Sequence, residues 1–125
     1  MVNKWEIYFC NLDPTNGSEQ RGTRPVLIIS TDSVNHNLTV STVLPLSSVK
    51  PTDKIYPTEV LLSTQVSGLP KLSVAMVQQI RPVSHSRLQN LAGKITDVAT
   101  QEKILAACKE YFDLQRHCHL LRHQP

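Results

Sequence analysis

The stretch "GSEQRGTRPVLIIS", residues 17–30, limits the possible folds of this 125-residue chain more than any other segment. A polar loop with two glycines and two arginines runs through Pro25 directly into four branched aliphatic residues. A short apolar run bounded by turn residues is typical of a strand that is covered on both faces. The sequence therefore predicts a buried strand at 25–30, with Arg21 and Arg24 held at its edge.

Four other segments also have strand character. In "WEIYFCNL", residues 5–12, Trp5, Ile7 and Phe9 alternate with more polar neighbours, which predicts a half-buried strand with those three side chains on one face. The remaining strands are expected at "LTVSTVLPLS" (38–47), "TEVLLS" (58–63) and "SVAMVQQIRPV" (73–83). Because no helix is expected between these five strands, a small antiparallel β-barrel is the favoured architecture.

The last third of the chain changes to helical spacing. Ser84 is expected to cap a short helix that holds Leu88 and Leu91. Thr96 or Asp97 is expected to cap a longer helix, and an apolar face on this helix is predicted to pack on the barrel: Val98, Leu105, Cys108 and Phe112. Residues 1–125 are thus predicted to form one mainly β domain with a C-terminal helix.

Composition sets broad limits on function. The net charge is +3 and the isoelectric point is near 8.9, which permits an RNA or DNA partner but fits an ordinary solvated surface equally well. Three cysteines, Cys10, Cys108 and Cys118, show no disulfide framework spacing. With no secretory signal and no apolar run long enough to span a bilayer, a reduced cytoplasmic protein without membrane contact is expected.

Two groups of side chains could carry phosphate chemistry. Arg21 and Arg24 stand near Glu19 and Gln20, and guanidinium groups in a glycine-containing loop could grip a phosphate and stabilise developing charge. An ordinary surface salt bridge from Glu19 to either arginine is the alternative reading. Ser47 and Ser48 end a predicted strand with hydroxyls that could donate to a phosphate oxygen, although serines at such positions are often turn formers.

The C-terminal "HCHLLRH" invites comparison with a zinc site, since histidine and cysteine are common ligands. The segment has no partner motif elsewhere, and a frayed cationic helix end is the favoured interpretation of His117, Cys118, His119 and His123. The chain also has no phosphate-binding glycine loop, dinucleotide fingerprint or paired-cysteine metal site. A cofactor-free reaction, or no reaction at all, is what remains.

The residues as a whole resemble the MazF/PemK family of bacterial toxins. The resemblance rests on "GSEQ" followed by "RP" in the first segment, on "TVLPLSS", and on "SGLPKLSVAMVQQIRPVSHSRL". It implies a homodimer of SH3-like barrels with the MazF/CcdB-like toxin fold. It also implies a sequence-specific, metal-independent endoribonuclease that cuts single-stranded RNA by attack of the ribose 2′-hydroxyl, and a MazE-like antitoxin that blocks the same groove.

The resemblance assigns roles to particular residues. Arg24 matches the essential arginine of the family, Ser47 falls where the family usually has threonine, and Glu19 would accept the 2′-hydroxyl proton or brace Arg24. Further RNA contacts are expected from the loop and strand ends, with the 48–57 loop tracking the strand or stacking a base: Gln20, Arg21, Ser48, Lys50, Lys54, Tyr56, Gln79 and Arg81. The chain departs from the family at Gln78, where many relatives carry an acid, and at Met76, where one branch carries arginine.

Three alternatives stay open on the sequence. The lost acid at position 78 leaves room for a weakened family member that binds RNA or antitoxin without cutting. A gyrase-binding toxin of the CcdB type would need an aromatic-bearing C-terminus, and "LLRHQP" argues against it. A plain interaction module would leave the placement of Arg24 and Ser47 unexplained.

Overall fold

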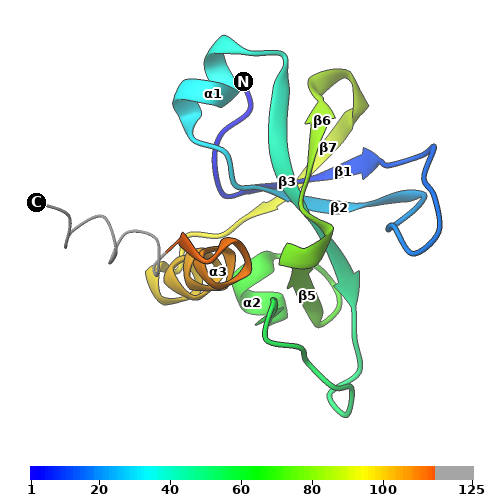
Figure 1. Ribbon diagram of the computed structural model, residues 1–125, viewed down its shortest axis with the longest axis vertical. Coiled ribbons are helices and arrows are strands. Elements are labelled where there is room, and N and C mark those ends of the chain that lie inside the picture. The colour runs from blue at the N-terminus through cyan, green and yellow to red at the C-terminus, as the bar shows by residue number, and fades with distance from the viewer. Residues whose placement is uncertain (115–125) are drawn as a thin grey trace, which may run out of the picture.

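The computed structural model describes residues 1–114 as a bent antiparallel sheet flanked by one long helix (Figure 1). The strands hydrogen-bond in the order β4-β5-β3-β2-β1-β7, and β6 pairs with β3 beside this path. Their bounds are β1 (Glu6–Asn11), β2 (Thr23–Ile28), β3 (Val40–Ser48), β4 (Glu59–Leu62), β5 (Ser73–Met76), β6 (Arg81–Ser84) and β7 (Leu88–Lys94). Because β3 pairs with β2, β5 and β6, the sheet curves around it, and the predicted mainly β, barrel-like architecture is confirmed.

The aliphatic run of β2 supplies both sides of the sheet, as its continuous apolar pattern predicts. Val26, Leu27 and Ile28 have no exposed surface. Leu27 belongs to the larger core cluster, together with Leu44 and Leu46, whereas Val26 and Ile28 belong to a second cluster. Burying three such side chains stabilises the fold by roughly 1.5–3 kcal/mol each, so β2 is a firm base for the loop that precedes it.

The one-sided pattern predicted for β1 is wrong. Ile7 and Cys10 are both fully buried, and they belong to the two different core clusters. The pairing of β1 with β7 shifts register between Ile7 and Tyr8 and again before Cys10. Such irregularities re-aim side chains, so strict alternation does not hold along this strand. Phe9 is half-buried, and it points to one of the cavities described below.

The helical segments differ from expectation in two places. Short helices appear at α1 (Asp32–Asn37) and α2 (Thr64–Ser67), although no helix was expected between the strands. The helix predicted after Ser84 is wrong: a single 3₁₀ turn, η2 (His85–Arg87), leads into β7, which pairs with β1. Another 3₁₀ turn, η1 (Val77–Gln79), interrupts the strand predicted at 73–83 and separates β5 from β6.

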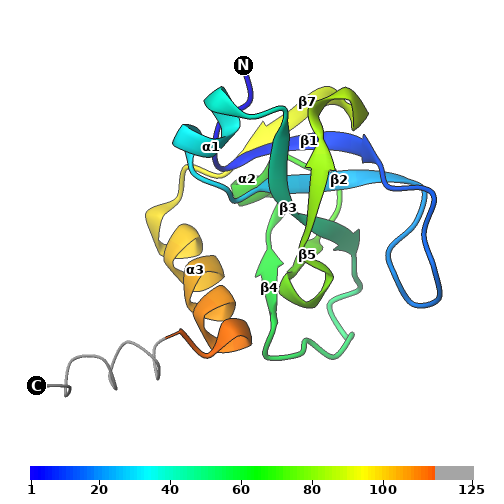
Figure 2. The ribbon, with the colours of Figure 1, turned by 45° about the horizontal axis from the view of Figure 1, so that its top comes forward.

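The C-terminal helix α3 (Val98–Phe112) begins where predicted, but it packs mainly through other residues than those predicted. Of the four residues predicted to pack on the barrel, Cys108 packs against the core cluster. Asp97 caps it, accepting a 3.0 Å hydrogen bond from the Thr100 amide. Thr100, Ile104 and Ala107 are the buried positions. Val98, Leu105 and Phe112 were predicted to pack on the barrel, yet they are 62%, 37% and 50% exposed. Figure 2 shows α3 beside β4, and the small side chain of Ala107 suits a close approach there.

None of the helices within residues 1–114 is long and apolar enough to cross a membrane.

Candidate active site

The β1–β2 loop, residues 12–22, is anchored at its base by two arginines from later in the chain. Arg81 of β6 donates from Nη1 to the Leu12 carbonyl oxygen at 3.1 Å. Arg87 of η2 donates to the carbonyl oxygens of Asn11 and Asp13, at 3.3 and 2.5 Å. Charge-assisted bonds of this kind fix the loop where it leaves β1. Arg81, predicted to contact RNA, therefore also has a role in holding the loop.

Inside the loop, backbone and side-chain bonds define one conformation. The Leu12 amide donates to the Gly22 carbonyl oxygen at 2.9 Å, and the Gly22 amide donates to Asp13 Oδ1 at 3.1 Å. Gly17 and Gly22 have φ angles of +55° and +77°, a region that favours glycine. The carboxylate of Glu19 accepts from the Asn16 amide. The loop is thus closed on itself as well as tied to the sheet.

Arg24 is oriented by the same loop. Its Nε donates to the Arg21 carbonyl oxygen at 3.0 Å, and Arg21 Nη2 donates to the Gly17 carbonyl oxygen at 3.2 Å. The salt bridge considered from Glu19 to either arginine is not formed within residues 1–114. Each guanidinium therefore keeps further N–H donors that an anionic group could engage.

The strand register places Arg24 and Ser47 on one face. Val26 of β2 pairs with Pro45 of β3. Arg24 and Ser47 stand two residues beyond this pair on their own strands, and side chains two apart share a face. Ser47 also pairs with Val74 of β5, which fixes its position from the other side. The two residues that the resemblance singles out are therefore brought to the same end of the sheet.

Two cavities flank the loop. The larger has a volume of about 390 Å³, and its lining includes three cations and several apolar side chains. The lining residues are Phe9, Arg21, Thr23, Arg24, Pro25, Leu46, Ser48, Leu69, Pro70, Lys71 and Ser73. No acidic residue lines it. A neighbouring cavity of about 300 Å³ shares Ser48 and Lys71 and adds Lys50 and Asp53. Together they form a depression with a positive rim, which suits a polyanion.

The smaller cavity, of about 140 Å³, lies on the Pro45 side. It is lined by Glu19, Gln20, Pro45, Gln78, Gln79, Ile80 and Arg81. Glu19 and Arg24 thus line different cavities in this conformation of the loop. Pro45 shares its face of β3 with Ser47, so the small cavity adjoins the face on which Arg24 and Ser47 stand.

Sequence reasoning missed Lys71 and Phe9. Lys71 sits in "GLPKL", where a lone cation between apolar residues gave no motif, and Phe9 was assigned to the core. Conversely, Lys54 and Tyr56 were predicted to track RNA but line neither cavity of the loop. They pair with each other, with Lys54 Nζ 5.3 Å from the Tyr56 ring centre.

Gln78 does not stand alone at the position where an acid was expected. Its Nε2 donates to Glu59 Oε2 at 3.0 Å, and its Oε1 accepts from the Thr58 hydroxyl at 2.9 Å. A carboxylate from β4 is therefore in direct contact with residue 78. Met76 is buried, so it takes no part in the surface of the site.

Within residues 1–114, Cys10 stands on β1 just before the loop, and its side chain is fully buried. Burial raises the pKa of the Cys10 thiol, although the nearby Arg81 and Arg87 charges oppose that shift. In the described part of the chain, no three histidine, cysteine, aspartate or glutamate side chains are grouped as metal ligands would be. The histidines and cysteine of "HCHLLRH" lie outside the described residues.

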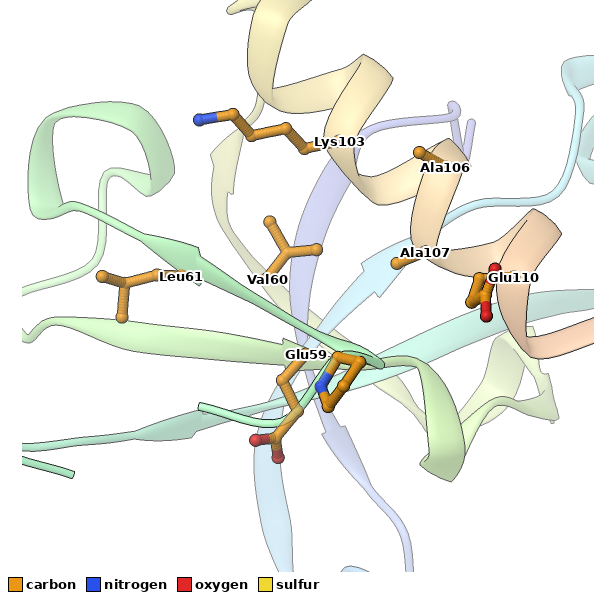
Figure 3. A pocket seen from close by; sticks show the side chains of 8 residues that line it. Glu59, Val60, Leu61, Lys103, Ala106, Ala107 and Glu110 are labelled. Carbon is orange, nitrogen blue, oxygen red and sulfur yellow. The ribbon is translucent and has the colours of Figure 1, made fainter. Parts of the chain in front are cut away.

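A fourth cavity lies away from the predicted site. It measures about 460 Å³ and opens between β4 and α3, where Val60 and Ala107 form part of its wall and Lys103 and Glu110 project from the helix (Figure 3). None of the predicted RNA-contacting residues lines it.

Residues 3–112 match the family described as PemK-like, MazF-like toxin of type II toxin–antitoxin systems. The chain belongs to this family. It is 34% identical over 119 residues to endoribonuclease MazF9 of Mycobacterium tuberculosis, covering 91% of this chain and 98% of that protein. It is 32% identical over 97 residues to endoribonuclease EndoA of Bacillus subtilis, and the match covers 78% of this chain and 83% of that protein.

Solved structures agree with this family. Mycobacterium tuberculosis toxin MazF-mt6 superposes with a TM-score of 0.70 at 26% identity, over 86% of this chain and 96% of that one. An endoribonuclease in complex with its cognate antitoxin, from a mycobacterial species, superposes with a TM-score of 0.74 at 22% identity. The superposition covers 91% of this chain and 97% of that one. At that identity the second likeness shows the fold alone.

Proposed function

We propose that this MazF/PemK-family toxin is a sequence-specific, metal-independent endoribonuclease that cuts single-stranded RNA. The observation that carries the proposal is the placement of Arg24 and Ser47 on one face of the sheet, with Arg24 also lining the cavity that holds Arg21 and Lys71. The curated relatives that the chain matches over most of their length are named endoribonucleases, which supports the same activity.

The chemistry assigned to the site is intramolecular transfer of the phosphoryl group, from the 5′-oxygen of one nucleotide to the 2′-oxygen of the nucleotide before it. The ribose 2′-oxygen bonds to the adjacent phosphorus while the bond from phosphorus to the 5′-oxygen breaks. The leaving 5′-oxygen takes up a proton from water, so the products are a 2′,3′-cyclic phosphate and a 5′-hydroxyl. Arg24 stabilises the extra negative charge on the phosphoryl oxygens, and Ser47 donates a hydrogen bond to one of them. Glu19 lines the small cavity that adjoins the face shared by Arg24 and Ser47, and from there it accepts the 2′-hydroxyl proton.

The RNA strand is assigned to the positive depression beside the loop. Arg21, Lys71 and Lys50 line its two connected cavities in sequence and would contact successive phosphates. Phe9 offers an aromatic face inside the larger cavity, where a base could stack. Gln20 and Ser48 supply polar groups along the same path.

We assign two protein partners. Val98, Leu105 and Phe112 recur at seven-residue spacing on α3 and leave an apolar stripe exposed, which suits burial against a second copy of the chain. A cognate antitoxin is the second partner, and one related toxin structure contains its antitoxin. The cytoplasm, where RNA and antitoxin meet, is the assigned compartment.

The test is cleavage of a long single-stranded RNA in EDTA by the wild type and by Arg24→Ala. The expected result is discrete cuts by the wild type, a loss of at least 100-fold with Arg24→Ala, and full activity with Lys109→Ala, which removes an exposed cation from α3. Intact RNA after incubation with folded wild-type protein, across varied RNA sequences, would overturn the enzyme. The binding-only reading, which the amide at Gln78 favours, would then take its place.

A further inference from the structure

One side-chain amide ties the tip of the β1–β2 loop to the barrel. Gln79 Oε1 accepts a hydrogen bond from the Gln20 amide, and Gln79 Nε2 donates to the Ser18 carbonyl oxygen, both at 3.2 Å. The amide therefore pairs with the loop backbone on both sides of Glu19. Outside the loop's own turns and its arginine-anchored base, these are the bonds that connect residues 14–20 to the rest of the described chain.

The element that presents Gln79 is firmly fixed. Val77, the first residue of η1, is fully buried, and its amide donates to the Thr58 carbonyl oxygen at 3.0 Å. The Ile80 amide then closes the turn on the Val77 carbonyl oxygen, also at 3.0 Å. Gln79 thus projects from a short, closed turn against the core, and a bond to it restrains the loop relative to the sheet.

The restraint reaches Arg24 through the loop backbone. The Gln20 amide is one residue before Arg21, whose carbonyl oxygen accepts from Arg24 Nε. Arg21 in turn donates to Gly17, one residue before Ser18, where Gln79 holds the other side of the loop tip. The peptide groups that Gln79 fixes therefore flank both Glu19 and the carbonyl oxygen that orients Arg24.

We propose that Gln79 is a positioning residue of the cleavage site, acting as a latch that holds the β1–β2 loop in the conformation that orients Arg24 and Glu19. This inference rests on the proposed ribonuclease function. It revises the expectation that Gln79 contacts RNA, because both ends of its amide are already engaged by the loop. Because both hydrogen bonds to the loop backbone come from the single Gln79 amide, we expect them to break and re-form together.

The first arm of the test measures the loop without any RNA. Hydrogen–deuterium exchange of full-length Gln79→Ala is expected to be about tenfold faster across residues 15–22 than in the wild type, since two hydrogen bonds of ordinary net strength are lost. Gln79→Glu keeps an acceptor for Gln20 and loses the donor to Ser18, so an intermediate rate is expected. Gln78→Ala is the matched control, because its amide bonds to Thr58 and Glu59 and not to the loop.

The second arm measures RNA cleavage. Gln79→Ala is expected to lower kcat about tenfold and to change KM less than twofold, with Gln79→Glu between the two proteins. Unchanged exchange in Gln79→Ala would overturn the latch, and a raised KM at constant kcat would show an RNA contact instead. If the wild type cuts no RNA, the ribonuclease proposal fails, while the exchange arm still decides whether Gln79 holds the loop.

Discussion

Gln78 Nε2 and Glu59 Oε2 lie 3.0 Å apart, so the amide at position 78 is paired with a carboxylate from β4. Many relatives were expected to carry an acid at position 78. In this chain an acid there would face Glu59, and the two like charges would repel each other. The amide is therefore the residue that fits the local charge, whatever its effect on catalysis.

Placing an acid at position 78 is expected to lower the thermal stability of the protein. Gln78→Glu should lower the midpoint of thermal unfolding by a few degrees at pH 7 and should not raise the cleavage rate. The double variant Gln78→Glu/Glu59→Gln exchanges the two groups and should recover the wild-type midpoint. Thermal unfolding of these three proteins and of the Glu59→Gln single variant gives the coupling directly. A stable, more active Gln78→Glu single variant would contradict the pairing.

Glu19→Gln tests the assignment of the proton acceptor. The substitution keeps a side-chain oxygen that can accept from the Asn16 amide, so the loop turn is preserved. It removes the basic carboxylate, and the cleavage rate at pH 7 should fall about 100-fold, the lower end for a general base. Glu102→Gln, on exposed α3, is the control. Activity within threefold of the wild type would leave Glu19 as a structural member of the loop.

Leu105→Lys tests the apolar stripe of α3. Leu105 is 37% exposed and is not among the buried residues of the helix, so the fold should survive the substitution. A charge placed in the middle of the stripe should convert a dimer into a monomer in analytical ultracentrifugation at micromolar concentration. Ala106→Lys is the matched charge change away from the stripe, because Ala106 is exposed and lines the cavity between α3 and β4. An unaltered dimer with Leu105→Lys would remove this stripe from the interface.

Asp97→Ala tests the cap of α3. Hydrogen bonds from the Thr100 hydroxyl and then from the Thr100 amide lower the pKa of Asp97 below its ordinary value of 3.8. The stabilisation is therefore fully present above pH 3.8 and is lost as the pH falls through the lower folded-state pKa. Asp97→Ala should be less stable than the wild type at pH 7 in denaturant unfolding. This difference should shrink below about pH 4, and a difference constant down to pH 2 would contradict the role of the charge.

The sequence predicts the parts of the fold that local pattern decides. Val26 to Ile28 form a run too apolar for any half-exposed strand, and the structure buries all three on two sides. Asp97 stands at the start of a helical pattern and caps it. Arg24 and Ser47 could be singled out through the family resemblance, and the register of β2 and β3 brings them to one face.

The predictions that were wrong concern segments whose structure depends on contacts with residues far away in the sequence. Leu88 and Leu91 have helical spacing, but β1 recruits residues 88–94 as a strand, so pairing overrides the local pattern. On α3 the apolar residues Val98, Leu105 and Phe112 are exposed, whereas Ile104 and Ala107 pack against the barrel. The Gln79 bonds to Ser18 and Gln20 span about sixty residues, and no local signal marks them.

The most direct test of the central claim is the chemistry of the cut ends. A short RNA that contains the mapped cleavage word is incubated in EDTA with the wild type, beside the same RNA carrying a single 2′-deoxy substitution at the scissile nucleotide. The account predicts 2′,3′-cyclic phosphate and 5′-hydroxyl ends from the first RNA and no cut in the second. Cleavage of the 2′-deoxy substrate, or 5′-phosphate ends, would contradict attack by the 2′-hydroxyl at Arg24 and Ser47.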